Sequence, residues 1–330
     1  MLIHIQARIS PSLVSISRLS TLFLLSSFFC ILPISFADEA GDNKKASLHS
    51  TTQLSSLFID PNLQQCIEQI ATASHWTQAE QISGRIDCKK QHISNLSGIE
   101  ALVNITSLDI SINQISDISP LSTLQRLEIL KLSFNTIAEL RPLMTLKQLK
   151  ILNIDNNMLT DITALANLYQ LRNLSLRNNL ISDIHALKGL TALRHLNLAV
   201  NNITDITALA NLSNMEYLSL LNNDVTDISI LENLSNLQGL HLGGNHIDHV
   251  ASIAGLMKLS NLNLSDNGLD SRHSTEVAAL ATVPSLQHID LSANKQLSCT
   301  ALSHLVSELN TVNTIVVPAI TQPGDTCNNP

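Results

Sequence analysis

The sequence predicts an α/β solenoid, a curved right-handed coil of about ten turns with a parallel concave sheet and a helical cap at each end. Two observations predict it. A pattern of apolar residues and asparagine recurs at every 22nd position, which is typical of a chain that stacks one structural unit repeatedly. The chain is also 44% hydrophobic but only 3% aromatic, so the stacked units must share a core of leucine and isoleucine.

One asparagine column defines the coils. Eight asparagines follow one another at this constant spacing and a ninth follows after a longer step, with Gln91 in the same place one coil earlier. A buried asparagine must satisfy two donors and a carbonyl oxygen, and stacked coils offer backbone groups that the strand ladder leaves unused. We therefore interpret as structural the column Asn113, Asn135, Asn157, Asn179, Asn201, Asn223, Asn245, Asn267 and Asn294.

The stretch LRHLNLAVNNITDITALANL shows how one coil distributes its side chains. In a strand with a period of two, Leu196 and Leu198 point inward. The outward side chains are then His195, Asn197 and Ala199. The pattern L-x-x-L-x-L-x-x-N-x-I resembles the leucine-rich repeat, and this resemblance implies a strand on one side of each coil and a turn or short helix on the other.

The first 37 residues have the features of a secretory signal peptide. They carry Arg8 and Arg18, no acidic residue, an apolar run and small residues before a cut after Ala37. A membrane anchor is the alternative, but an apolar run of about 17 residues is short for a hydrocarbon core of roughly 30 Å. We expect residues 38–57 to form a flexible polar leader, and no membrane insertion after cleavage.

Four cysteines follow the expected cut, two near each end of the repeats: Cys66, Cys88, Cys299 and Cys327. An even number in an exported chain indicates disulfides. The two ends of the array lie roughly 40 Å apart at strand spacing, far beyond the reach of a disulfide. The pairing that remains is Cys66–Cys88 and Cys299–Cys327, and free buried thiols are the alternative. Disulfides and a signal peptide together predict a secreted, periplasmic or cell-envelope location.

Both ends of the array carry a candidate cap. Residues 58–91 form the expected N-terminal cap and first strand, with Asp60 as a helix N-cap, Pro61 at the first helical position and an apolar face that includes Cys66. Cys88 holds the inward place that Ile110 takes one coil later, so a helix over the first strand brings the two cysteines together. The repeats span residues 92–294. Residues 295–330 form the expected C-terminal cap, with a helical face and a last strand TIVV; the face comprises Leu302, Leu305, Val306 and Leu309.

The regular acids and the histidines do not indicate a metal site. The acids stand where the chain turns away from the strand, and a short carboxylate there accepts backbone N–H bonds; they are Asp117, Glu139, Asp161, Asp183, Asp205 and Asp227. His195 and His241 lie two coils apart, about 9 to 10 Å, whereas zinc needs each ligand nitrogen at about 2 Å. No catalytic motif occurs either. We predict no metal, no cofactor and no enzyme activity.

The outward strand positions are the candidate binding surface, because they vary without harming the core. Tyrosine and arginine are the residue types in which binding energy concentrates. The predicted partner-binding residues are Ile129, Lys131, Ile151, Arg172, Arg177, Arg194, His195, Tyr217, Leu221 and His241. They make a mixed apolar and basic patch on an acidic chain, whose net charge of −8 becomes −10 without Arg8 and Arg18. This balance argues against nucleic acid as a partner.

The coil NQISDISPLSTL resembles the 22-residue subclass of leucine-rich repeats, to which the internalins of invasive bacteria belong, and the segment FIDPNLQQCIEQI resembles the internalin cap with cysteines added. The resemblance implies that the chain recognises another protein, or adheres to it, through the concave strand face. We expect the exported chain to be a monomer. An envelope scaffold or glycan-binding module is a second hypothesis. A regulator of a serine/threonine phosphatase, from the same subclass, is a third.

Overall fold

A computed structural model describes residues 54–294, 296–297, 305 and 314–316. The expected signal peptide, most of the expected leader and the Cys299–Cys327 pair lie outside these residues. So does the expected C-terminal cap, apart from Gln296, Leu297, Leu305 and the last strand. In the described part of the chain, the longest helix has 13 residues, and none is long and apolar enough to cross a bilayer.

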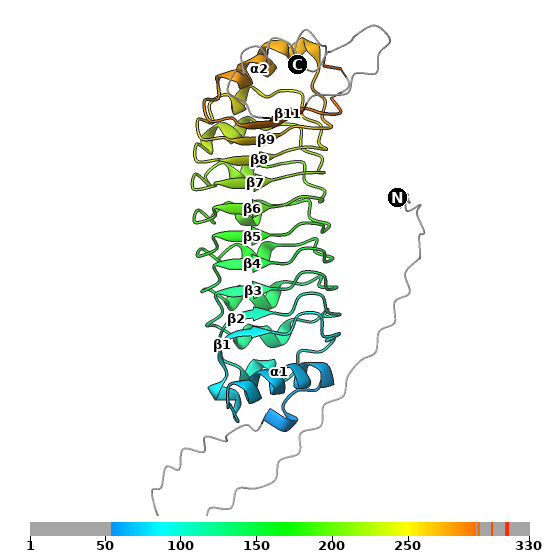
Figure 1. Ribbon diagram of the computed structural model, residues 1–330, viewed down its shortest axis with the longest axis vertical. Coiled ribbons are helices and arrows are strands. Elements are labelled where there is room, and N and C mark those ends of the chain that lie inside the picture. Colours follow the sequence, from blue (N-terminus) through cyan, green and yellow to red (C-terminus); the bar gives the residue numbers. More distant parts are fainter. Residues whose placement is uncertain (1–53, 295, 298–304, 306–313, 317–330) are drawn as a thin grey trace, which may run out of the picture. The chain divides into compact units, whose positions relative to one another are not determined.

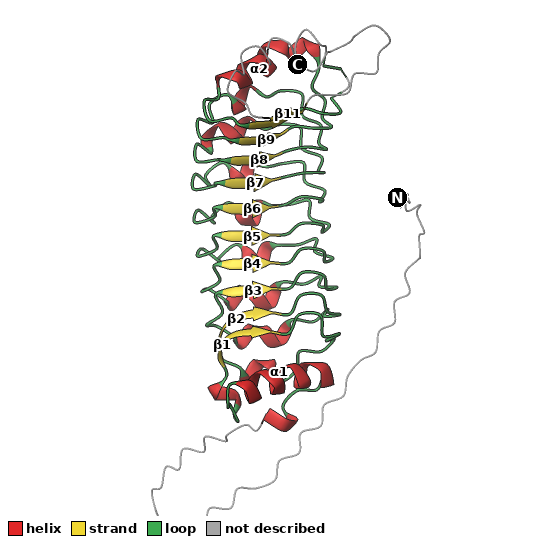
Figure 2. Ribbon diagram, in the orientation of Figure 1, coloured by secondary structure: helices red, strands yellow, loops and turns green. Residues whose placement is uncertain are grey.

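Eleven strands form one open parallel sheet in sequence order (Figures 1 and 2). From β2 onward each strand pairs with the next in constant register, as His195 pairs with Tyr217 and Leu196 with Leu218, whereas the register of β1 on β2 shifts between Gly84 and Arg85. The predicted solenoid is confirmed. The strands are β1 Ser83–Asp87, β2 Asn104–Asp109, β3 Ile129–Lys131, β4 Ile151–Asn153, β5 Asn173–Ser175, β6 His195–Asn197, β7 Tyr217–Ser219, β8 Gly239–His241, β9 Asn261–Asn263, β10 His288–Asp290 and β11 Thr314–Val316.

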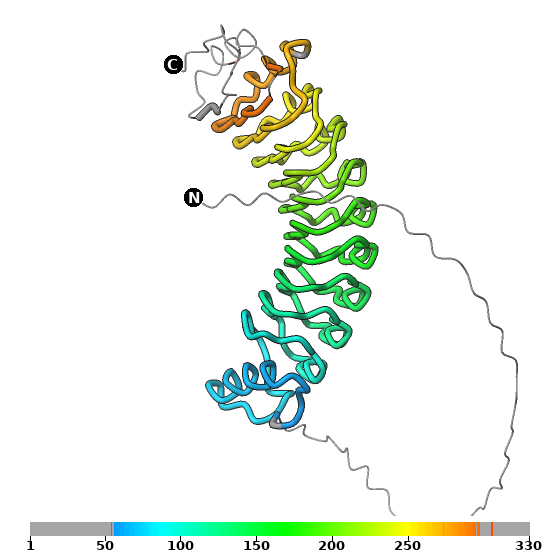
Figure 3. Tube along the Cα trace, turned by 90° about the vertical axis from the view of Figure 1, so that its right-hand side faces the viewer, coloured from blue at the N-terminus to red at the C-terminus, as the bar shows by residue number. Residues whose placement is uncertain are grey.

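Short 3-10 helices lie on the other side of the coils, and the strands line the concave side (Figure 3). Two further 3-10 helices precede β1, η1 Leu54–Ser56 and η2 Ala79–Gln81. Those after β1 in the described residues are η3 Ile99–Ala101, η4 Ser119–Thr123, η5 Arg141–Thr145, η6 Thr163–Leu165, η7 His185–Leu187, η8 Thr207–Leu209, η9 Ser229–Asn233, η10 Ala251–Ile253, η11 Ser271–His273 and η12 Leu280–Thr282. The longer coil before β10 also holds the α-helix α2 Ser274–Ala279.

The core lies between the two sides of each coil. Leu196 and Leu198 are fully buried, and Leu193 and Ile203 of the same coil join them. Full burial of one such side chain stabilises the fold by about 1.5 to 3 kcal/mol. A coil gains this stabilisation only when the neighbouring coils cover its apolar side chains. Ala199, expected on the outer face, is only 3% exposed; its small side chain is covered there without entering the main core cluster.

The asparagine column ties each coil to the one before it. Asn201 donates from Nδ2 to the carbonyl oxygens of Leu198, 2.9 Å away, and Leu176, 3.1 Å away. Its Oδ1 accepts the N–H of Ile181 at 3.1 Å. The same three kinds of bond recur at Asn223. Each of these asparagines therefore satisfies backbone groups of two successive coils at once.

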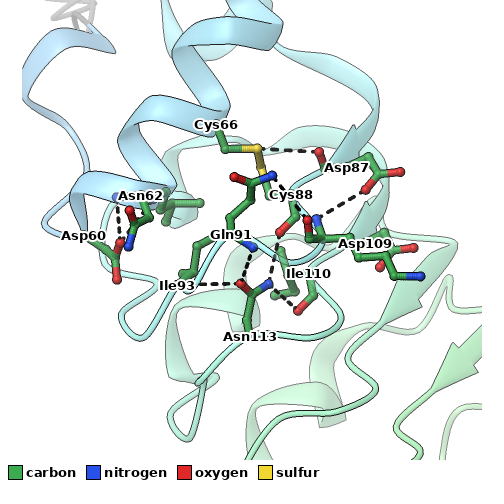
Figure 4. Close-up of a disulfide and its surroundings, with 12 residues drawn as sticks. Asp60, Asn62, Cys66, Asp87, Cys88, Gln91, Ile93, Asp109, Ile110 and Asn113 are labelled. Carbon is green, nitrogen blue, oxygen red and sulfur yellow. Dashed lines mark hydrogen bonds between the residues drawn. A yellow bond between two sulfur atoms is a disulfide. The ribbon is translucent and has the colours of Figure 1, made fainter.

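The N-terminal cap is the helix α1 Pro61–Ala73, joined to the first strand by a disulfide between Cys66 and Cys88 (Figure 4). The Cα atoms of the two cysteines are 5.9 Å apart, and Asn113, the first ladder asparagine, donates to the carbonyl of Cys88 at 3.0 Å. Packing begins before the expected cap boundary at residue 58. Leu54, assigned to the flexible leader from its polar surroundings, is only 7% exposed, and its carbonyl accepts a bond from Gln64.

Candidate functional site

The concave strand face presents four columns of side chains. We name the columns by position relative to the strand. In the coil of β6, His195 and Asn197 are the first and third residues of the strand and define the first and third columns. Arg194, just before the strand, belongs to the leading column, and Ala199, after the strand, to the trailing column. The first and third columns are the outward residues of the strand, and the other two flank it. Residues of one column lie one coil apart along the stack, so equivalent side chains of successive coils can interact directly.

The leading column contains a run of charges that pair along the stack. Glu128 binds Lys150 at 2.7 Å, and Arg194 binds Glu216 at 2.6 Å. Arg172 stands between these pairs, is exposed, and has no salt bridge among the described residues. The predicted basic patch is therefore narrower than the sequence suggested, because Glu216 neutralises Arg194. Sequence reasoning overlooked Glu128, Lys150 and Glu216, although the repeat period places them in one column.

The first column contains an apolar pair. Ile129 and Ile151 are paired residues of β3 and β4, and both are partly exposed. Lys131, in the third column of β3, lies 3.6 Å from the carboxylate of Asp109 on β2. His195 follows in the first column of β6 and is exposed. This half of the face therefore combines an apolar surface with a cation that is already partly neutralised.

Tyr217 lies over Gly239 on the next strand. A Cβ atom at Gly239 would come within 2.8 Å of Tyr217 Cδ2, so the ring occupies the space that a side chain would take. The ring also contacts the imidazole of His241, with centroids 5.2 Å apart and planes tilted by 46°. Burial lowers the pKa of His241 below its ordinary value, which favours the neutral ring at pH 7. Leu221, in the trailing column of β7, is half-buried.

The third column is largely occupied with its own backbone. Asn153, Asn197 and Asn263 each accept on Oδ1 the N–H of the residue two positions later. Asp109 and Asp290 accept in the same way. These side chains build the turn that ends each strand. The Oδ1 atoms of these three asparagines are therefore already occupied by backbone N–H groups.

Arg177 in the trailing column is exposed, and its neighbour Asp155 bonds to its backbone and not to its guanidinium. Asp155 Oδ1 accepts the hydroxyl of Ser175 at 2.5 Å and the backbone N–H of Arg177 at 2.8 Å. The guanidinium of Arg177 makes no salt bridge within the described residues. Arg172 and Arg177 thus place two uncompensated cations at opposite ends of β5.

The regular acids on the far side of the coils build turns, as predicted. Asp161 accepts the N–H of Thr163 at 2.7 Å, and this bond is the main cause that lowers the pKa of Asp161. Glu139, one methylene longer, makes no such bond in the described structure. The described residues hold no cluster of three or more potential metal ligands. The aspartates that accept the N–H two residues later are Asp117, Asp161, Asp183, Asp205 and Asp227.

Comparison with known proteins matches this chain to leucine-rich repeats and to internalins. Residues 125–167 and 169–211 match the family model of leucine-rich repeats in two copies. Internalin C2 of Listeria monocytogenes is 32% identical, with a TM-score of 0.60 over 64% of this chain and 96% of that one. An internalin (inlF) of the same organism is 28% identical, with a TM-score of 0.56 over 84% and 95% of the two chains. The functional domain of its InlJ, which includes a cysteine ladder, is 18% identical, with a TM-score of 0.60 over 83% and 73%. No curated protein matches the sequence.

Proposed function

Because the chain belongs to the internalin-like leucine-rich repeat proteins, we propose that it is exported and binds another protein through its concave strand face. The fold in general mediates recognition between proteins. The disulfide Cys66–Cys88 supports export, since such bonds persist in oxidising compartments, and so do the signal-peptide features of residues 1–37. The proposed location is secreted, periplasmic or on the cell envelope, and the proposed role is recognition or adhesion without catalysis.

The observation that carries the proposal is the contrast between fixed and unfixed side chains on the strand face. The third column is largely held by turn-building bonds, and the leading column on either side of Arg172 by ion pairs. Arg172 and, in the trailing column, Arg177 remain without salt bridges in the described structure, and Tyr217 presents a ring that lies on the sheet. Arginine and tyrosine are enriched where binding energy concentrates.

The chemistry of these residues indicates the kind of partner. Two arginines at the ends of β5 suit carboxylates, which accept paired N–H bonds from a guanidinium. Ile129 and Ile151 on one side and Tyr217 on the other suit apolar or ring-shaped side chains. We therefore propose a protein partner whose contact surface carries acidic residues among apolar ones. His195 lies between the two regions and adds a hydrogen-bonding group.

The test uses substitutions that borrow residues from the same columns of other coils. Arg172→Gln copies Gln238 of the leading column, and Tyr217→Asn copies Asn173 of the first column, so the double variant should keep the fold. Cross-linking the protein in its native medium identifies the partner, and the affinity of each variant for that partner is then measured. We expect a loss of roughly tenfold or more for the double variant, as for the truncation of binding hot spots.

The matched control is Arg126→Gln, which removes an exposed arginine that stands just before the strand face, two positions ahead of Glu128 in the leading column. This variant should bind as the unchanged protein does. Undiminished capture by the Arg172→Gln/Tyr217→Asn variant, with an unchanged circular dichroism spectrum, would remove the concave face from consideration.

A further inference from the structure

Four large apolar side chains stand exposed in the turns that follow β2 to β5. Ile112 is 40% exposed and Phe134 56%, and both immediately precede the ladder asparagine of their coils. Met158 is 54% exposed and Leu180 57%, and both immediately follow it. Because the strands are parallel, the turns that follow them lie on one flank of the stack (Figure 1). We call these four residues, with the partly exposed Val200 of the next coil, the flank stripe.

The backbone conformation at part of the flank stripe is unfavourable for the residues found there. The residue before the ladder position has a positive φ in every coil from Lys90 to Ala293. Asparagine, which tolerates this left-handed conformation, fills the position at 156, 178 and 222. Ile112 at 57° and Val200 at 59° are β-branched and fit it poorly. At Ile112 and Val200 the left-handed backbone conformation and the contact of an apolar side chain with water are both unfavourable. The folding of the coil therefore gives no reason for apolar residues at these positions.

The flank changes character along the stack. At its beginning stand the exposed Lys89 and Lys90. From the coil of β7 onward the same described positions hold only polar or small residues, and Asp224 lies 3.5 Å from His246 there. Exposed apolar patches on folded proteins mark contact sites when polar residues surround them. Here the polar ends differ in charge, with a basic end before the flank stripe and an acidic residue, Asp224, just after it.

We propose that the flank stripe is the interface of a homodimer, in which two copies pair antiparallel about a twofold axis near Met158. A twofold axis places the same patch of both copies in contact. Met158 belongs to the fourth coil, so the axis brings the first coil of one copy beside the seventh coil of the other. Lys90 then lies next to the partner's Asp224, and this charge pair forms twice.

The dimensions fit a weak dimer in place of the monomer expected from the sequence. The six coil steps from Lys90 to Asp224 span about 29 Å at a strand spacing of about 4.8 Å. A standard interface buries about 800 Å² per partner, which requires the flank to be covered over nearly this whole length. Dissociation in the micromolar range is therefore expected, with the apolar residues at the centre and the charges at the rim.

Sedimentation velocity of the purified protein across a wide concentration range tests the proposal. Ile112→Asn/Phe134→Asn removes two apolar side chains and installs the residue that the same column already uses three times, so this variant should melt no lower than the unchanged protein. We expect self-association to weaken roughly tenfold or more. Met257→Asn is the matched control, because Met257 is 59% exposed but lies outside the flank stripe; it should leave the dimer intact.

Charge reversal tests the antiparallel arrangement. Lys90→Glu and Asp224→Lys should each weaken the dimer, and the two together should restore it, since the pair is rebuilt with opposite signs. A protein that is monomeric at every concentration, or a dimer that survives Ile112→Asn/Phe134→Asn, would overturn the proposal. So would charge reversals that fail to rescue one another. The Arg172→Gln/Tyr217→Asn variant of the strand face should dimerise normally, which separates this surface from the one proposed for the partner.

Discussion

Tyr217 covers the backbone of Gly239, and the absence of a side chain at Gly239 lets the ring lie beside His241. Gly239→Ala would place a Cβ atom within 2.8 Å of Tyr217 Cδ2, so the ring must rotate away. Because only one side chain moves, the free energy of unfolding should change by less than about 1 kcal/mol. The pKa of His241 should rise toward its ordinary value as water reaches the imidazole. Proton NMR titration of the histidines measures this shift.

The control for Gly239→Ala is Gly255→Ala, because a Cβ atom at Gly255 meets no atom within 4 Å. It should leave the titration of His241 unchanged. If His241 titrates identically in the Gly239→Ala variant, the tyrosine ring does not shield it.

Replacing both cysteines of the cap, as in Cys66→Ala/Cys88→Ala, should destabilise the N-terminal end of the stack selectively. The cysteines are 22 residues apart, and cross-linking a loop of about this length stabilises by about 3 kcal/mol in the chain-entropy account. Each coil contacts only its neighbours, so the loss should be concentrated in α1, β1 and β2. Hydrogen exchange should become faster at the amides of position 88 and of Lys90, which bond to β2 and its following turn.

Amides of the middle coils, such as that of Leu220, serve as the internal reference and should keep their protection. Reduction of the unchanged protein should give the same pattern as the double variant. Equal loss of protection throughout the stack would contradict a local role for the disulfide.

Asn201→Ala should be strongly destabilising. It leaves the N–H of Ile181 without its side-chain acceptor, in a place where the Asn201 side chain is only 9% exposed. The carbonyl oxygens of Leu176 and Leu198 each lose one of two side-chain donors, because Asn179 and Asn223 still bond to them. One unsatisfied buried N–H costs about 1 to 3 kcal/mol and each further lost hydrogen bond about 0.5 to 1.5 kcal/mol, so we expect a loss of about 2 kcal/mol or more in the free energy of unfolding. Denaturant titration followed by circular dichroism measures it.

The neighbouring Asn202 provides the control, because its side chain is exposed. Asn202→Ala should change the free energy of unfolding by no more than about 0.5 kcal/mol. Similar losses for the two variants would mean that the ladder asparagine acts through something other than its buried bonds.

Periodicity explains which features were predictable. Leu196 and Leu198 had to point inward because a strand alternates, and Cys88 had to meet the cap because it occupies an inward place over which α1 lies. The predicted strand-face residues remain a prediction as a binding site. Salt bridges within a column were harder to predict. Arg194 and Glu216 share a column, but their contact depends on side-chain conformation. Leu54 was missed because its burial depends on the cap and not on the repeat.

The repeat period also could not predict how one coil without an acid in this column completes its turn. The coil of β8 has His249 where five other coils have aspartate, and Glu276 from α2 supplies the missing carboxylate. Its Oε2 accepts the N–H of Val250 at 2.9 Å and that of Ala251 at 3.3 Å. The inserted helix that breaks the regular spacing therefore completes the turn of the preceding coil. Alignment of the coils in the sequence shows only that histidine replaces aspartate at position 249.

The pair of His249 and Glu276 should make stability depend on pH. The hydrogen bond to Glu276 is the main cause that raises the pKa of His249. This stabilisation is fully present below the ordinary histidine pKa of about 6.5, and it is lost as pH rises through the raised value. Burial raises the pKa of Glu276, but the bonds from His249 and the Val250 and Ala251 amides outweigh it, so the net pKa is lowered. The glutamate contribution is therefore present above about pH 4.3 and is lost as pH falls through the lowered value.

Both contributions are complete only between these limits, at about pH 4.3 to 6.5. The difference in unfolding free energy between the unchanged protein and Glu276→Gln should be greatest there and smaller on both sides. Glu232→Gln is the control, since Glu232 is exposed and lies near the same turn on η9; its difference should show no maximum in this window. Denaturant titrations at several pH values measure both differences. A Glu276→Gln difference that stays constant from acidic to alkaline pH would show that the carboxylate acts only as an uncharged cap and that the ion pair with His249 contributes nothing.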